Sequence, residues 1–127
     1  MDLLTPEAHA GAYEWATVLL AHFALGGYAT ACLAFVFHWM VPPSRRPHGQ
    51  FALGTLLTAL AALYGAGWEG LAQGYGAGLA DAAVDTVAVV CGGVAAWAAW
   101  HRRARLIGVA LSIMAAVAAI GIRKRDR

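Results

Sequence analysis

Charged side chains are scarce in this sequence, and basic ones are missing from its first third. Charged residues make up 13% of the 127 residues, whereas a typical soluble domain has about 25%. No Lys or Arg occurs before Arg45. Nucleic-acid binding requires a basic face on a folded domain. The basic residues here fall instead in short clusters beside apolar segments, so we expect no nucleic-acid partner.

Cysteines and metal-ligand patterns are also sparse. The chain has two cysteines, Cys32 and Cys91, each within an apolar run, which excludes a disulfide framework. No set of His, Cys and carboxylate residues has the spacing of a zinc site. A haem site at His22 would need a partner histidine on a facing segment, and the later apolar segments have none in their cores. We found no Ser-His-Asp arrangement and no phosphate-binding loop. The sequence therefore predicts no metal, no cofactor and no catalytic residues.

Long apolar runs dominate what is present. Hydrophobic residues make up 61% of the chain, and four segments are largely apolar: about 13–41, 50–67, 79–100 and 106–122. A bilayer crossing needs about 20 such residues. Lipid cannot satisfy exposed backbone amides, so these segments must be helices or strands of a closed barrel, and they lack the alternation of barrel strands. We predict a single all-α domain, an integral membrane bundle of about four transmembrane helices, with the lipid bilayer as its main partner.

The basic clusters set the expected orientation. Arg45 and Arg46 follow the first segment, which Pro42 and Pro43 should end, and a second cluster at 102–105 follows the third segment. Basic loops stay in the cytoplasm. We therefore predict a multi-pass protein of the bacterial inner membrane with its N-terminus outside. Four crossings would also place the basic tail at 123–127 outside, which conflicts with this rule.

Ionisable residues inside the apolar segments are the candidate functional residues. Such residues are costly in a membrane and usually face the bundle interior or a cavity. The candidates for binding are Glu14, His22, Trp68, Glu69, Gln73, Asp81 and Asp85. Asp81 and Asp85 are four residues apart at the start of the third segment. Glu69 and Gln73 have the same spacing and share one face if their segment is helical. Structural alternatives remain open: Asp81 as a first-turn acid, Asp85 in a structural hydrogen bond, Glu69 in a solvated loop, and His22 as a satisfied core histidine.

Small residues recur at helical spacing in the last two segments. The third segment has Asp85, Ala88, Gly92, Ala95 or Ala96, and Ala99, and the fourth has Gly108, Ser112, Ala115 and Ala119. Small side chains let membrane helices approach closely. These faces predict either close packing within one chain or a homo-oligomer.

The region from about 68 to 92 resembles the VanZ-like group of small membrane proteins. The resemblance rests on Trp68, Glu69, Gln73, Asp81, Asp85 and Gly92, with Gly92 seven residues after Asp85. This chain departs from the family pattern at Val89, where the family has Asn, and in the loop before Asp81, which lacks the family's Arg. The resemblance implies a polytopic bundle in the cell envelope and marks Glu69, Gln73 and Asp85 as a site without naming a ligand.

The sequence leaves four functions open. The first is a non-enzymatic, VanZ-like envelope protein that binds a lipid or another envelope ligand through an outer polar cluster. The second is a holin-like lysis protein of phage or prophage origin, which opens membrane lesions by oligomerisation. The third is a small proton or ion conductor, and the fourth is an accessory subunit of a larger membrane complex.

Overall fold

The computed structural model describes residues 11–46, 49–75 and 78–125. Over these residues the chain is helical between short turns and has no strand, so the prediction of an all-α fold is confirmed. The elements are α1 (Ala12–Met40), a 3-10 turn η2 (Pro43–Arg45), α2 (Gly49–Leu60), a π-helix η3 (Ala61–Ala72), α3 (Leu79–Trp100) and α4 (Ala104–Arg125).

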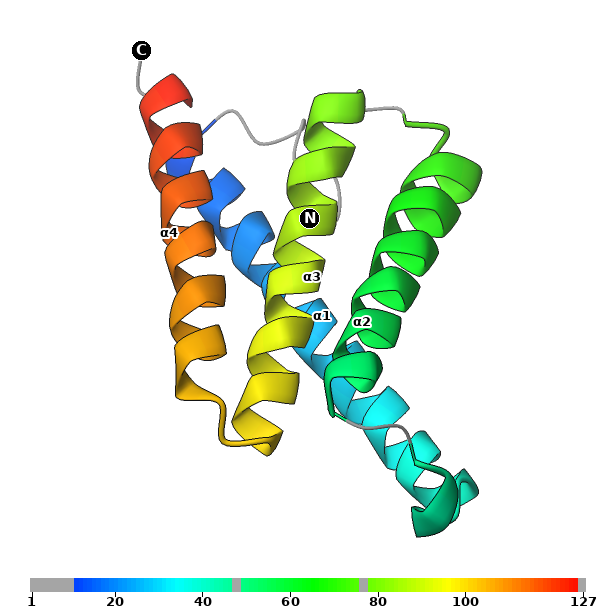
Figure 1. Ribbon diagram of the computed structural model, residues 1–127. Helices are drawn as coiled ribbons and strands as arrows, with labels where there is room; N and C mark the ends of the chain where they lie inside the picture. The colour runs from blue at the N-terminus through cyan, green and yellow to red at the C-terminus, as the bar shows by residue number, and fades with distance from the viewer. Residues whose placement is uncertain (1–10, 47–48, 76–77, 126–127) are drawn as a thin grey trace.

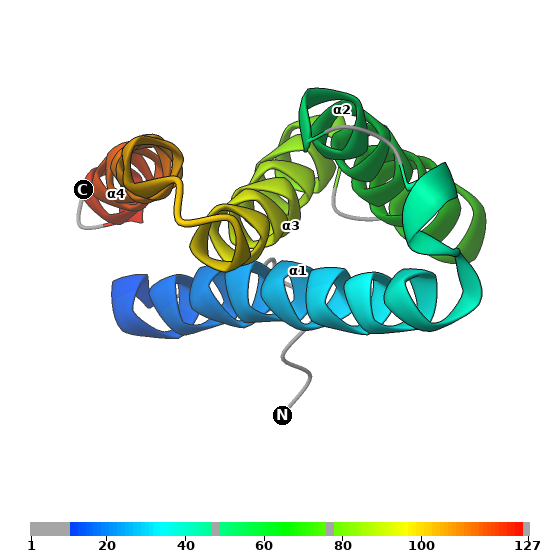
Figure 2. The same cartoon turned by 60° about the horizontal axis from the view of Figure 1, so that its bottom comes forward.

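Helix α3 is the central element of the bundle. It packs against α1, α2, η3 and α4. Figure 1 shows α2 and η3 rising on one side of α3 and α4 rising on the other, while α1 descends obliquely across them. In the view of Figure 2, α1 lies along one side of the other three helices. We call the end holding the starts of α1 and α3 the upper end, as drawn in Figure 1, and the opposite end the lower end.

Among the described residues, three helices are long and apolar enough to cross a membrane: α1, α3 and α4. The second predicted segment, 50–67, is occupied by α2 and η3, which have 12 residues each. Leu60 keeps helical backbone angles, so η3 continues directly from α2. The helical rod therefore extends to Ala72, five residues beyond the end of the predicted segment. The hydrogen-bonding pattern changes from α-helical to π-helical at Ala61, so this rod consists of two short elements, α2 and η3.

Helix α1 is longer than one perpendicular crossing requires. Its 29 residues span about 43 Å at 1.5 Å per residue, compared with a hydrocarbon core of about 30 Å. Residues 31–40 are all exposed, and Figure 1 shows this end of the helix leaving the bundle at its lower end. Arg46 caps the helix there: its Nε donates to the Val41 carbonyl and its Nη2 to the His38 carbonyl, both at 3.0 Å. Tilting is one way in which a bilayer accommodates a helix of this length.

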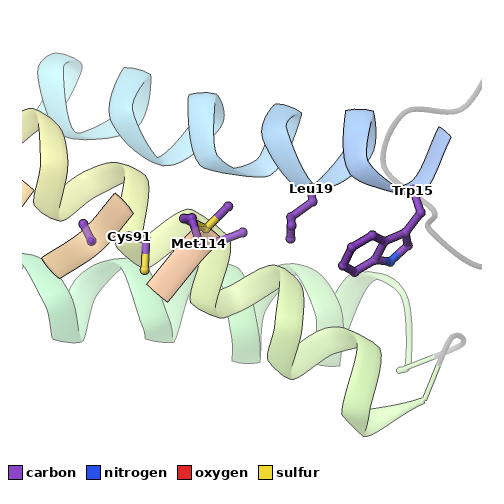
Figure 3. Packing of buried hydrophobic residues seen from close by; sticks show 6 residues of the cluster. Trp15, Leu19, Cys91 and Met114 are labelled. Carbon is purple, nitrogen blue, oxygen red and sulfur yellow. The ribbon is translucent and has the colours of Figure 1, made fainter. Parts of the chain in front are cut away.

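The apolar core lies between α1, α3 and α4. Trp15 and Leu19 point from α1 toward the region where Cys91 of α3 and Met114 of α4 lie (Figure 3), and Ala88 and Ala110 complete this buried cluster. Many large apolar side chains remain exposed outside it, among them Leu111, Ile113 and Ile120 of α4. An exposed apolar surface of this kind is unfavourable in water and suits lipid.

Glycines bring α1 and α3 into close contact. A Cβ atom added at Gly26 would collide with the Val89 carbonyl of α3, and one added at Gly92 would collide with the Phe23 carbonyl of α1. Ala88 is also buried at this crossing. Ala88 and Gly92 of the small-residue row on α3 therefore serve packing within the chain. The corresponding residues of α4, namely Gly108, Ser112, Ala115 and Ala119, are all exposed.

Candidate functional site

The helices bring ionisable side chains together in the upper half of the bundle. Helix α1 supplies His22, η3 supplies Tyr64 and Glu69, and α3 supplies Asp81 and Asp85. We call these five residues the polar cluster. His22 is 0% exposed, Asp85 2% and Glu69 4%, so the cluster includes groups that no solvent reaches. Charged side chains are almost never buried so deeply unless they are paired.

His22 and Asp85 form the deepest pair of the cluster. The Nδ1 atom of His22 lies 3.0 Å from the Val18 carbonyl oxygen and 3.5 Å from Oδ1 of Asp85. A carbonyl oxygen only accepts, so the contact with Val18 is a hydrogen bond when Nδ1 carries the proton. In the neutral ring this leaves the lone pair on Nε2. That atom is buried and has no hydrogen-bond partner among the described residues.

The close crossing of α1 and α3 explains why this pair forms. His22 lies one turn before Gly26, and Asp85 lies one turn before Val89, the residue whose backbone Gly26 touches. Side chains one turn apart share a helix face. The contact that brings the two backbones together therefore also places the imidazole ring against the carboxyl group.

Tyr64 and Glu69 share a face because η3 is a π-helix. They are five residues apart, which matches the i to i+5 hydrogen bonding of such a helix. In an α-helix, at about 100° per residue, the same two side chains would be about 140° apart. Both are instead buried. The ring of Tyr64 meets that of His22 edge to face, with centroids 5.5 Å apart. π-Helical segments are rare and are frequent at functional sites.

The hydroxyl of Tyr64 lies among carboxyl groups. It interacts electrostatically with the carboxyl groups of Glu69, Asp81 and Asp85. Glu69 lies close enough to the hydroxyl to act on it through a weak hydrogen bond as well. The Oη atom nevertheless has no described partner within normal hydrogen-bond geometry, and neither does Oε1 of Glu69. Buried polar atoms are usually satisfied, so these atoms indicate a place where water or a ligand completes the network.

A basic residue from α4 lies at the upper edge of the cluster. The guanidinium group of Arg125 stacks on the Trp15 ring, 4.5 Å from its centroid, and interacts electrostatically with Asp81. Trp15 in turn packs on Gly121, because a Cβ there would collide with the indole ring. Helix α4 therefore returns fully to the upper end. Trp15 and Asp81 therefore surround Arg125 at the upper end, although the positive-inside rule favours the opposite end for basic residues.

The other predicted residues lie outside the buried cluster. Glu14 and Trp68 are exposed, and Gln73 is half-buried directly after η3, where its backbone amide donates to the Trp68 carbonyl at 3.0 Å. The structure thus brings together His22, Glu69, Asp81 and Asp85. It adds Tyr64 of η3, which is not among the predicted residues, and Arg125, which belongs to the basic C-terminal segment. In the described part of the chain, no group of three or more His, Cys, Asp or Glu residues is arranged to hold a metal ion.

Comparisons with protein-family models, with curated proteins and with solved structures give no match to this chain.

Proposed function

We propose that the chain is a small, non-enzymatic, VanZ-like protein of the bacterial inner membrane that binds a lipid headgroup at the upper end of its bundle. The three long apolar helices and their exposed apolar surfaces support the membrane location. The upper end faces outside, because the Arg45–Arg46 and Arg102–Arg105 clusters lie at the lower end.

The observation that carries the proposal is a pair of unsatisfied carboxylate oxygens. Oε1 of Glu69 and Oδ2 of Asp81 are buried and accept no hydrogen bond from any described residue. A ligand with N–H donors would supply the missing hydrogen bonds to these two oxygens. A hydrogen bond to a charged group contributes about 1.5–3 kcal/mol. The site therefore favours a ligand that carries a primary ammonium group.

The basic end of α4 extends this preference to a zwitterion. Arg123 and Lys124 are exposed beside Arg125, which is itself near Asp81. A phosphate group suits this basic end, while the ammonium group suits the carboxylates. Phosphatidylethanolamine carries both groups at short separation. The proposed ligand is accordingly a phosphoethanolamine headgroup in the outer leaflet.

Native mass spectrometry of the chain released from bilayers of equal phosphatidylethanolamine and phosphatidylglycerol tests this proposal. The protein should retain phosphatidylethanolamine preferentially. Asp81→Asn or Glu69→Gln should weaken that preference about tenfold, since about 1.4 kcal/mol corresponds to a factor of ten. Arg102→Gln, which removes one charge at the lower end, serves as the control. Equal retention of both lipids by the unaltered protein would contradict the proposal.

A second copy of the chain is the proposed protein partner. Support comes from the exposed row of small residues on α4, since the matching row on α3 is used within the chain. The holin-like alternative would use the same face to build a lesion. Induced expression separates the two: normal growth agrees with a headgroup-binding protein, whereas abrupt growth arrest with leakage of large solutes would favour the holin-like function.

A further inference from the structure

The lower layer of the polar cluster is not explained by headgroup binding. His22 is completely buried, and its Nε2 atom has no hydrogen-bond partner among the described residues. Its other nitrogen is held by Val18 and Asp85. A headgroup at Glu69 and Asp81 lies about one helical turn above this pair, because Asp81 precedes Asp85 by four residues, or about 6 Å. The unpartnered nitrogen therefore needs an explanation of its own.

Protonatable groups connect His22 to the upper end. Those facing it from α3 are Asp85 and, one turn higher, Asp81, while those from η3 are Tyr64 and Glu69. Helix α4 contributes Arg125 at the upper edge, and α1 itself carries Glu14 about 12 Å above His22. Helix α2 contributes no titratable side chain. The unsatisfied oxygens of Tyr64, Glu69 and Asp81 are continuous with this route and suit bridging water.

An apolar layer closes the route toward the lower end. Leu60 lies one turn below Tyr64, Val89 lies one turn below Asp85, and these residues pack together in a buried cluster. Leu60 is 3% exposed and Val89 is 2% exposed. Thr30 is the buried polar side chain at this level, and no ionisable side chain is buried below it in the described part of the chain. Apolar constrictions of this kind keep water and ions from passing.

We propose that His22 and Asp85 form a proton-binding site that is reached from the upper end and sealed from the lower end by Leu60 and Val89. A proton that passes from the upper end along bridging water is taken up by the lone pair of Nε2, and the water molecule that delivers it is left neutral. The resulting imidazolium keeps its Nδ1–H directed at the Val18 carbonyl and at the Asp85 carboxylate, which balances its charge. The site binds protons whether or not a headgroup is present.

The test uses the full chain in bilayers of phosphatidylglycerol alone, so that failure of headgroup binding does not affect the result. Histidine labelled with ¹⁵N reports the charge state of the ring directly, and His22→Gln assigns its signal. The His22 signal should change from neutral imidazole to imidazolium between pH 8 and pH 4. Proton flux into vesicles containing the unaltered protein should equal that of empty vesicles, because the lower half is closed.

A polar substitution in the apolar layer is expected to open it and so to allow proton flux across the protein. Leu60→Ser should raise proton flux at least tenfold, and Asp85→Asn in the same chain should return it to the level of empty vesicles. Leu63→Ser is the matched control, since Leu63 is 67% exposed on the neighbouring turn. A His22 ring that stays neutral across this pH range would overturn the proposal, as would flux through the unaltered protein. Leu60→Ser without added flux, in a folded protein, would overturn the assignment of the seal.

Discussion

Replacing Gly92 by alanine is expected to destabilise the bundle by about 1–3 kcal/mol or more, although it adds only a methyl group. The new Cβ would collide with the backbone carbonyl of Phe23. A backbone atom cannot rotate away, so α1 and α3 would have to separate along their crossing. That movement would also pull His22 away from Asp85. The measurement is the temperature at which the purified protein loses its monodisperse elution in detergent.

Gly54→Ala is the matched control for this prediction. No atom lies within 4 Å of the position that its Cβ would take. Alanine is favoured over glycine inside a helix by about 1 kcal/mol, so this variant should be as stable as the unaltered protein or more stable. The two identical substitutions are therefore expected to act in opposite directions. Equal stability of both variants would show that α1 and α3 do not approach as closely as described.

His22→Ala is the second substitution with a large expected effect. His22 is among the largest fully buried side chains of the protein, so truncation leaves a cavity between α1, η3 and α3. Large-to-small changes at such positions cost about 2–5 kcal/mol, and here the Asp85 carboxyl group also loses its contact with the imidazole. His38→Ala, at an exposed position of the same helix, should change stability by no more than about 0.5 kcal/mol. Unfolding in the same detergent measures both variants.

A double substitution separates packing from polar pairing. His22→Leu alone restores volume but leaves the buried carboxyl group of Asp85 without the imidazole. His22→Leu combined with Asp85→Leu removes both polar partners, and replacing a buried ion pair by apolar residues is often neutral or stabilising. The double variant should therefore be more stable than either single variant. This outcome would mean that the pair is not required for folding, which agrees with a role in binding.

The helix ranges could be predicted from the sequence because a long apolar segment suited to lipid must satisfy its own backbone hydrogen bonds, and a helix does so. The apolar run at 79–100 coincides with α3, and Pro42 follows α1 almost directly, as a residue without an amide donor should. The end of the second helix was harder to predict. Glycine lowers helix propensity, so the glycines at 65, 67 and 70 favour an end at about residue 67, whereas the structure continues the helix to Ala72. Packing of this stretch against α3 outweighs that local preference.

The composition of the site was less predictable than its location. Four ionisable candidates meet because ionisable side chains inside apolar helices usually turn inward, whereas Glu14, near the start of α1, is exposed. Tyr64 was missed because it reaches the cluster only through the π-helical spacing, which periodicity does not reveal. Arg125 was missed because its contact with Trp15 joins residues from the two ends of the chain. Neither contact has a local sequence signal.

We propose that lipid surrounds the apolar helices while their buried acids face inward, and the native cysteines allow the lipid contact to be measured without new substitutions. Cys32 is exposed on α1 and Cys91 is buried, so a nitroxide reagent should label only Cys32. After reconstitution into a bilayer, collisions of this nitroxide with oxygen, which concentrates in lipid, should exceed those with a water-soluble nickel chelate. Preferential collision with the nickel chelate would place this face of α1 in water and would contradict a membrane-spanning α1.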